Sequence, residues 1–404
     1  MTQQVELAIA GGGLIGLLLG SACAGAGLDV AVVDRQDPRA MLGEAFDGRS
    51  SAIAFGSRRV LDALGLWPEI AAEAEPILEI RVADDGSPLF LHYDRRDLQD
   101  PTPLGYIVEN RVLRRVLLER IRSLESLLFL APLDVAAVAT SSLAAVATLS
   151  DGRQIVARLI AAADGQESRL RRNAGIRTIE RRYRQTGIVT TVRHERPHCG
   201  VAVEHFLPAG PFAILPMTGN RSSIVWTEQA ELAARLAALP DAAFAAEIAA
   251  RFGDFLGAVE PIGPRWTYPL CLMLAERYVA ERLALVGEAA HVIHPIAGQG
   301  LNLGIRDIAT LAELVIDRRR LGLDIGDPEL LGHYQRWRRL DTLALAAVTD
   351  GLNRLFSNEF LPLRLARDLG LATVHRLPPL KRLLMRDAMG LVGDLPRLVR
   401  GEPL

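Results

Sequence analysis

The sequence has few of the residues that cross-link a chain or anchor it in a bilayer. Its 404 residues include three cysteines, Cys23, Cys199 and Cys271. Because they are odd in number and far apart, they argue against a disulfide framework or a cysteine metal site and are typical of a reducing compartment. No apolar run reaches the roughly 20 residues that a spanning helix needs. The first apolar run enters a glycine-rich turn without a preceding basic segment, so we expect no signal peptide.

The chain also lacks an excess of positive charge. It has 46 Lys and Arg residues against 48 Asp and Glu, a net charge of −2, and nothing in it indicates nucleic acid binding. A composition of 50% hydrophobic, 5% aromatic and 23% charged residues is that of an ordinary globular protein, large enough for two or three substructures. We find no Ser/His/Asp or Cys/His signature, and we interpret the isolated His194, His198 and His205 as surface or structural residues.

The N-terminal residues carry a pattern typical of dinucleotide binding. Val5 to Ala10 predicts a buried strand, Gly11-x-Gly13-x-x-Gly16 a tight turn, Leu14 to Gly27 a helix, and Asp29 to Asp34 the next strand. Asp34 follows the glycines by about 20 residues, where an acid accepts a hydrogen bond from a ribose hydroxyl. The glycines alone are weak evidence, but the five features in register predict a dinucleotide site. Because Arg35 follows directly, the acid does not say which dinucleotide binds.

A second glycine-rich stretch runs from Leu283 to Asp307. Leu283 to Val286 predicts a short strand, and a loop leads to a helix that we expect to begin near Gly300. A helix start offers free backbone N–H groups and a positive dipole end, which suit an anion or the electron-rich edge of a ring. The alternative is a strand-loop-helix corner whose glycines only permit a tight turn.

Together these stretches resemble the FAD-dependent aromatic hydroxylases, the para-hydroxybenzoate hydroxylase-like flavoprotein monooxygenases. The three fingerprints of that family occur here in order: Gly11-x-Gly13-x-x-Gly16, Ala163-Asp164-Gly165-x-x-Ser168-x-x-Arg171, and Gly287-Glu288-Ala-Ala-His291-x-x-x-Pro295-x-x-Gly298-Gln299-Gly300. One position departs from the family. Glu288 stands where the family usually has the Asp that holds the flavin ribityl chain, so a carboxylate remains, one methylene longer.

The resemblance implies roles for individual residues. Arg49 matches an arginine beside the flavin, with a solvated loop arginine as the alternative, and Arg111 matches one that reaches the FAD. Pro295 is expected next to the isoalloxazine, as the residue of the flavin-side pocket, and no protein base is nominated. The implied cofactor-binding set is Gly11, Gly13, Gly16, Asp34, Arg35, Arg49, Arg111, Asp164, Gly165, Gly287, Glu288, Pro295, Gly298, Gln299, Gly300, Leu301 and Asn302.

We interpret other ionisable residues near these motifs as surface or structural residues. Arg114 and Arg115 look like solvated helix charges. His291 and His294 could assist proton transfer near neutral pH, but we favour packing or loop-fixing roles for both.

The sequence predicts an α/β fold with a Rossmann-like FAD-binding domain, an inserted, mainly antiparallel β-sheet substrate domain and a C-terminal helical region. The FAD-binding parts are expected at residues 1–75, 101–182 and 269–328, the substrate sheet at 76–100 and 183–268, and the helical region at 329–404. Within this scheme, Asp84-Asp85-Gly86 and Asp151-Gly152 signal turns between strands, and residues 230–252 form an alanine-rich helical stretch.

The tail narrows the resemblance. Tyr334 to Asp341, Pro378-Pro379-x-Lys381 and Gly390 to Gly401, together with residues 105–111 and 294–307, resemble the ubiquinone-biosynthesis hydroxylases. That branch implies FAD as cofactor, NAD(P)H as reducing co-substrate, and hydroxylation of a polyprenylated phenol by O2 through a flavin C4a-hydroperoxide. The alternatives are a hydroxylase of a small soluble phenol, a flavin-dependent prenyl reductase, and a catalytically silent scaffold in a biosynthetic complex.

A polyprenyl substrate also implies a location. Its tail partitions into bilayers, yet the sequence predicts no spanning helix. We therefore expect a bacterial cytoplasmic protein that contacts the inner membrane peripherally or assembles with other enzymes of ubiquinone biosynthesis.

Overall fold

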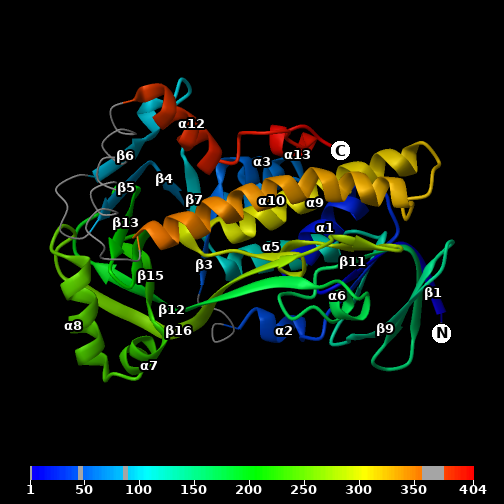
Figure 1. Cartoon of the computed structure of the whole chain (residues 1–404), viewed down its shortest axis with the longest axis horizontal. Helices are drawn as coiled ribbons and strands as arrows, with labels where there is room; N and C mark the ends of the chain where they lie inside the picture. The colour runs from blue at the N-terminus through cyan, green and yellow to red at the C-terminus, as the bar shows by residue number, and fades with distance from the viewer. Residues whose placement is uncertain (1, 44–48, 85–89, 357–376) are drawn as a thin grey trace.

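Two large sheets lie at opposite ends of the molecule, and two long helices run side by side across it (Figure 1). These helices are α9, Gln299–Arg320, and α10, Pro328–Phe356. The computed structural model describes residues 2–43, 49–84, 90–356 and 377–404.

The first sheet forms the dinucleotide-binding end. Its strand order is β17-β18-β11-β1-β2-β8, and β18, β11, β1, β2 and β8 are parallel neighbours. A hairpin, β9 and β10, extends from β11. The strands are β1 Thr2–Ala10, β2 Val30–Val33, β8 Leu127–Leu130, β9 Val135–Thr140, β10 Ala145–Leu149, β11 Gln154–Ala162, β17 Val279–Ala280 and β18 Leu283–Leu285.

This sheet is buried because helices cover it. Leu7 and Ile9 of β1 and all of β2 are buried, so these strands have near-continuous apolar sequences, as parallel strands do when both faces are covered. The covering helices include α1, Leu14–Gly25, α5, Asn110–Arg122, and α9. The predicted strand-turn-helix-strand unit is confirmed, with α1 ending two residues earlier than expected. The hairpin at Asp151-Gly152 is also confirmed.

The second sheet has the order β19-β16-β12-β15-β14-β13-β5-β6, and every neighbouring pair is antiparallel except β13 and β5. The predicted mainly antiparallel sheet is therefore confirmed. Its strands are β5 Glu79–Asp84, β6 Phe90–Asp94, β12 Thr178–His194, β13 Val201–Leu207, β14 Gly210–Met217, β15 Arg221–Gln229, β16 Val259–Ala275 and β19 His291–Val292. Of the predicted turn at Asp84-Asp85-Gly86, the last two residues lie outside the described part of the chain.

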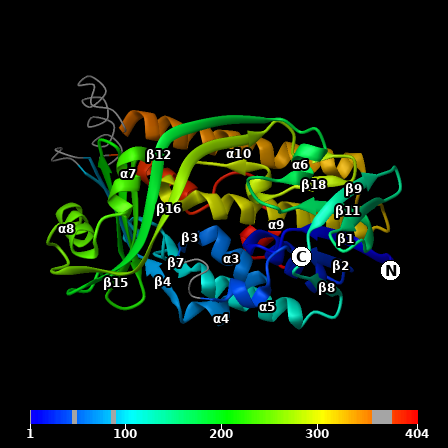
Figure 2. The same cartoon turned by 90° about the horizontal axis from the view of Figure 1, so that it is seen from below.

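Two helices cover the outer face of this sheet, as Figure 2 shows from below. They are α7, Ala230–Ala237, and α8, Asp241–Phe252, so the predicted helical stretch 230–252 is divided ahead of Pro240, the residue that precedes α8. Phe244 and Ile248 of α8 pack on Trp226, Phe212 and Ile188 of the sheet. The opposite face is left for the interior of the molecule.

A small third sheet, β3-β7-β4, lies beside α9. It consists of β3 Ser50–Ala54, β4 Ala74–Ile77 and β7 Gly105–Glu109, and the short helices near it are α2 Pro38–Met41, α3 Phe55–Ala63 and α4 Trp67–Ala71. Asn302 fastens β3 to α9, because its side-chain oxygen accepts from the Ala54 N–H at 2.9 Å and its nitrogen donates to the Ala52 carbonyl at 2.8 Å.

The predicted domain division stays a prediction. Strands β5 and β6, from the 76–100 segment, do join the second sheet. However, β12 crosses the predicted boundary at 182/183 and β16 crosses the one at 268/269. Both of these predicted boundaries therefore fall inside strands of the second sheet rather than in linkers.

The C-terminal residues pack back on the rest of the chain. The Trp337 indole of α10 donates to the Asp394 carbonyl at 2.9 Å, and Arg397 pairs with Asp317 of α9 at 2.6 Å. Besides α10, the region contains α12, Pro378–Ala388, and α13, Arg397–Arg400. Across the described ranges, none of the helices combines the length and the apolar character that crossing a membrane requires.

A fully buried carboxylate connects the two long helices to the loop that follows β18. Asp307 of α9 accepts from Arg338 Nε of α10 at 2.8 Å and from the Gly287 N–H at 3.0 Å, and it bonds His291 Nε2 at 2.6 Å. Burial raises the pKa of Asp307, but the charges of His291 and Arg338 outweigh burial and hold that pKa below its ordinary value. Such a buried charge is tolerated only when it is paired.

Asp307→Asn should lower the free energy of unfolding by about 3–5 kcal/mol, because it leaves the Arg338 guanidinium buried with less compensation. Urea unfolding at pH 7 measures this. A carboxyl whose folded-state pKa is depressed stabilises the protein above its unfolded pKa of about 4 and loses that effect as the pH falls through the folded-state value. The difference from wild type should therefore shrink at acid pH.

The matched control is Asp62→Asn, which removes the partly exposed Arg58–Asp62 pair and should cost at most about 1 kcal/mol. Equal effects of the two substitutions would contradict the account of the buried network.

Candidate functional site: a dinucleotide cradle joined to an apolar lobe

The three fingerprints meet at one edge of the first sheet. They follow β1, β11 and β18, which are parallel neighbours whose last residues, Ala10, Ala162 and Leu285, are in register. A Cβ on Gly11, which has φ +106°, would lie 2.2 Å from the Ala163 carbonyl oxygen. The first two turns are thus in direct backbone contact, at the carboxyl edge where such sheets bind ligands.

The glycines of the first turn have different surroundings. A Cβ on Gly16 would lie 1.8 Å from the Gly11 carbonyl oxygen, whereas a Cβ on Gly13 would meet no protein atom within 4 Å. Asp34 accepts from the Gly12 N–H at 2.5 Å and from the Gln36 N–H at 2.7 Å. These bonds hold its carboxylate over the turn.

The second fingerprint is fixed by its own helix. Ser168 caps α6, Arg169–Asn173, and Arg171 donates to the Ala289 carbonyl of the third fingerprint at 2.9 Å. Asp164 Oδ2 accepts from the Arg169 N–H at 2.9 Å, while Asp164 Oδ1 is buried and has no hydrogen-bond partner among the described residues. A buried acceptor of this kind calls for a ligand donor.

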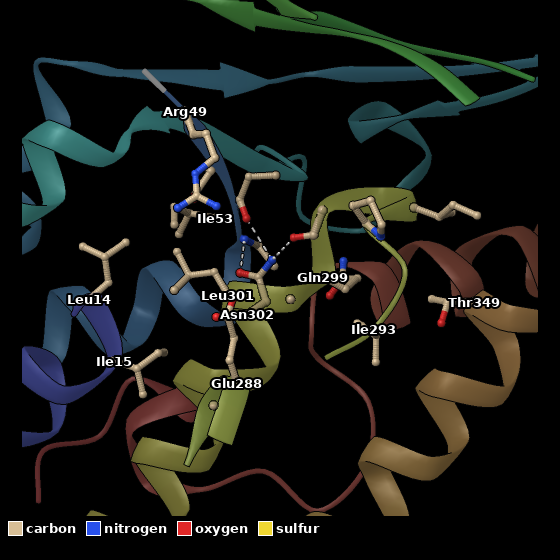
Figure 3. A pocket seen from close by; sticks show the side chains of 18 of the residues that line it. Leu14, Ile15, Arg49, Ile53, Glu288, Ile293, Gln299, Leu301, Asn302 and Thr349 are labelled. Atoms are coloured by element: carbon tan, nitrogen blue, oxygen red, sulfur yellow. Dashed lines mark hydrogen bonds between the residues drawn. The ribbon is translucent and has the colours of Figure 1, made fainter. Parts of the chain in front are cut away.

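The third fingerprint supplies a helix start (Figure 3). Gly298, in the left-handed conformation with φ +61°, precedes α9, and no side chain caps the helix. Its first turn therefore presents backbone N–H groups and the positive end of a 22-residue helix dipole. Glu288 is exposed in the same region. In Figure 3, Asn302 lies between the helix start and the strand to which it is bonded.

A cavity of about 1440 Å³ joins these elements. Small-molecule sites usually occupy about 300–1,000 Å³, so this one has room for more than one ligand. Fifteen of the seventeen predicted cofactor residues line it: Gly11, Gly13, Asp34, Arg35, Arg49, Asp164, Gly165, Gly287, Glu288, Pro295, Gly298, Gln299, Gly300, Leu301 and Asn302. Gly16 and Arg111 do not.

Arg111 does not line the cavity. Its Nε pairs with Glu109 at 2.6 Å and its side chain is 46% exposed, away from the cavity lining. Asn110 and Arg114 line the cavity instead, and Arg114 is buried, so its interpretation as a solvated helix charge was wrong. Arg115 is partly exposed and pairs with Glu73, as a surface charge does.

Arg49 lines the cavity and lies over the Tyr268 ring, 4.8 Å from its centroid. This cation–π contact holds the guanidinium against the second sheet. The solvated-loop alternative for Arg49 is therefore not supported.

The two histidines of the third fingerprint have structural environments. His291 is bonded to Asp307 in the buried network. His294 is fully buried, packs edge-on against Tyr183, and its Nδ1 is 3.4 Å from the Ile296 N–H, the acceptor geometry of a weak hydrogen bond. Burial lowers the pKa of His294 to about 4, so this imidazole is neutral at pH 7. The predicted loop-fixing roles fit these positions.

The far part of the cavity, which we call the apolar lobe, was missed by the sequence analysis. It is lined by the inner face of the second sheet and by α10 and α12, mainly through Ile80, Val82, Leu91, Ala202, Phe206, Ala213, Leu215, Val225, Leu345, Val348, Leu384 and Met385. No local motif marks these residues, because they come from five strands and two helices.

One cluster has the residue types of a metal site. Glu79, His92 and Asp94 place possible ligand atoms within 4.8 Å of one another. However, Arg96 bonds both oxygens of Asp94 and lowers the pKa of that carboxyl to about 2, and Arg81 pairs with Glu79. Arginines therefore already neutralise these carboxylates.

The cavity fits FAD on three features of its own. Gly13 and Gly300 leave open space where a Cβ would be, Asp164 Oδ1 is a buried acceptor without a partner among the described residues, and the uncapped start of α9 faces the same space. Close backbone approach, an acceptor for ribose or ribityl hydroxyls and donors for an electron-rich ring are what a flavin dinucleotide requires.

Comparisons with known proteins agree with this geometry. The family described as "FAD binding domain" matches residues 4–345. Ubiquinone hydroxylase UbiL of Rhodospirillum rubrum is 54% identical over 405 residues, covering 100% of this chain and 94% of that protein. The 3-demethoxyubiquinol 3-hydroxylase of Escherichia coli is 33% identical, with coverage of 96% and 99%.

Among solved structures, p-nitrophenol 4-monooxygenase of Pseudomonas putida superposes with a TM-score of 0.81 at 19% identity, covering 97% of this chain and 99% of that one. At this identity the likeness shows the fold. Because the family match spans most of the chain and the two relatives are matched over 94% and 99% of their length, the chain belongs to the ubiquinone-biosynthesis hydroxylase family of FAD-dependent monooxygenases.

Proposed function

We propose that this protein hydroxylates the aromatic ring of a polyprenylated phenol, with FAD as cofactor and NAD(P)H and O2 as co-substrates. One observation carries the proposal. A single cavity of about 1440 Å³ runs from the dinucleotide turn at Gly11 and Asp34, past the start of α9, into the apolar lobe. This arrangement brings a bound flavin and an apolar substrate into the same space.

The reaction needs no nucleophile or metal from the protein. Bound FAD, once reduced by NAD(P)H, supplies the activation of O2 and the transfer of one oxygen atom to an electron-rich ring. The N–H groups at the start of α9 stabilise negative charge on the ring system, because the helix dipole points its positive end at the cavity. Pro295 shapes the adjacent wall, and the apolar lobe excludes water from the reacting groups.

The polar residues of the cradle are proposed to bind the dinucleotide. We propose that Asp34 accepts a hydrogen bond from a ribose hydroxyl and that Asp164 Oδ1 accepts one from another hydroxyl of the dinucleotide. Glu288 is proposed to bind the ribityl chain. The extra methylene of Glu288 is accommodated because this side chain is exposed in the cavity rather than packed in the core. Asn110 and Arg114 take the position that the family resemblance gave to Arg111.

The substrate tail is proposed to leave the apolar lobe between α10 and α12. Val348 and Leu384 line the cavity and are 56% and 36% exposed, so they lie at an opening. Leu340, 74% exposed, shares a helical stripe with Val348, and Leu383, 53% exposed, is next to Leu384. Exposed apolar side chains around an opening suit contact with a lipid bilayer.

This supports peripheral contact with the inner membrane of a bacterial cell, through which a polyprenylated phenol reaches the cavity. We propose the same face for any assembly with other enzymes of ubiquinone biosynthesis, because the substrate would pass between them there.

The first prediction concerns the flavin. The purified protein should show FAD absorption bands, and anaerobic NADPH should bleach them faster when a short-chain prenylated phenol is present. Under air, the product should gain one oxygen atom by mass spectrometry. Equal turnover with a small unprenylated phenol would favour a hydroxylase of soluble phenols, and a protein that cannot take up FAD would favour a silent scaffold.

Gly13→Ala should reduce FAD binding while leaving the fold intact, because the new Cβ meets no protein atom and occupies space in the cavity. Flavin content and the unfolding midpoint measure the two effects. Gly351→Ala is the matched control, because its Cβ also meets nothing and it does not line the cavity. Unchanged flavin content in Gly13→Ala would contradict the cradle. Gly298→Ala is a poor substitute, since φ +61° and a 2.8 Å approach to Ala52 strain the backbone.

The double variant Leu340→Ser, Leu383→Ser should bind vesicles of phosphatidylcholine and phosphatidylglycerol at least about tenfold more weakly than wild type, because each inserted leucine stabilises binding by about 1.5–3 kcal/mol. Co-sedimentation measures this. Leu143→Ser is the control, since Leu143 is 82% exposed but lies in a hairpin turn away from the cavity opening. Equal losses in both proteins would show that this face is not the contact.

A further inference from the structure

A single carboxyl interrupts an apolar row on the inner face of the second sheet. The pairing of six adjacent strands sets six residues directly opposite one another, in the order Val189, Val225, Ala213, Glu204, Val82 and Leu91. All six line the cavity. Five are apolar, and Glu204, on β13, is the one residue of the row with a polar side chain.

The register shows which way Glu204 points. Its neighbour His205 is opposite Phe212, which belongs to the cluster under α7 and α8, so His205 lies on the outer face. Side chains alternate along a strand, so Glu204 shares the inner face with Phe206. Phe206 packs against Leu91 and against Ile296, the residue after Pro295. Glu204 therefore faces the apolar lobe next to the flavin-side loop.

Nothing in the described part of the chain neutralises this carboxyl. It makes no hydrogen bond or ion pair with the described residues. Glu204 keeps partial exposure to the cavity, and its apolar surroundings raise the pKa of its carboxyl to about 7. An unpaired carboxyl among apolar side chains is unfavourable, and a ligand with one polar group removes that cost.

We propose that Glu204 hydrogen-bonds the ring hydroxyl of the phenolic substrate and thereby sets which ring carbon faces the flavin. This inference rests on the proposed function, since it assumes a phenol in the apolar lobe. The prenyl tail has no polar group, so the ring hydroxyl is the group of the substrate that can form a hydrogen bond. Glu204 is the residue of its row that can form a hydrogen bond with it. One such bond fixes the rotation of the ring, which packing alone leaves free.

The test compares two ligands and three forms of the FAD-loaded protein. The ligands are a short-chain prenylated phenol and its methyl ether, which keeps the shape and removes the O–H donor. The proteins are wild type, Glu204→Gln and Glu204→Leu. The dissociation constants are measured by the change in flavin absorbance, and the hydroxylated products by chromatography.

Wild type should prefer the phenol over the ether by about 10- to 100-fold, as expected for a hydrogen bond to a charged group. Glu204→Leu should abolish that preference and give a mixture of hydroxylated positions, whereas Glu204→Gln, which keeps an acceptor of similar size, should retain a preference of about two- to tenfold, as expected for a hydrogen bond between neutral groups, and a single product. His205→Gln, one residue away on the outer face, is the matched control and should behave as wild type.

Two results would overturn the assignment while leaving the proposed function intact. One is a Glu204→Leu protein that keeps both the phenol preference and the single product. The other is loss of the preference in Tyr93→Phe but not in Glu204→Leu, because Tyr93 also lines the cavity and carries a hydroxyl. Wild-type protein that binds neither ligand would instead overturn the proposed function, and the role of Glu204 with it.

Discussion

The close backbone approach of Gly11 to Ala163 is the constraint on which the cofactor site depends. A Cβ on Gly11 would lie 2.2 Å from the Ala163 carbonyl oxygen, so the turns after β1 and β11 can meet only because Gly11 has no side chain. Gly16 repeats this relation within the first turn, where a Cβ would lie 1.8 Å from the Gly11 oxygen. The cradle is thus shaped mainly by backbone, and the few side chains that enter it, such as Asp34 and Asp164, are held by N–H groups of the same turns.

A second constraint fixes the start of α9 against this cradle. Asp307, two turns into the helix, bonds the Gly287 N–H, His291 and Arg338, and Asn302 bonds β3. The first ties α9 to the loop after β18 and to α10, and the second ties it to the small sheet. With both in place, the uncapped helix start has one position relative to the cavity. Its dipole can then stabilise charge on a bound ring without the free-energy cost of first moving the helix start into position.

The sequence predicted the parts of this site that depend on local patterns. The three fingerprints, Asp34 and the helix start carry their own signals, because turn geometry and strand order follow from glycine spacing and apolar runs. Arg111 shows what local patterns cannot predict, namely which face of a helix points into the cavity. The α5 helix begins at Asn110, so Arg114, four residues on, shares the face of Asn110 that lines the cavity, while Arg111 turns toward Glu109. The apolar lobe could not be predicted, since its wall comes from strands and helices far apart in the chain.

The division of the cavity into a polar cradle and an apolar lobe has a consequence for selectivity. Apolar contacts discriminate weakly, by about 1–3 kcal/mol for a methylene that must fit, and the exit that we propose between Val348 and Leu384 would let a long tail continue outside the lobe. On this proposal the protein does not select for the length of the tail. Selectivity for the ring must come from polar contact, because a buried polar group left unpaired by the wrong ligand costs far more than a missing methylene. In a row of apolar side chains facing the flavin-side loop, Glu204 is placed to impose that cost.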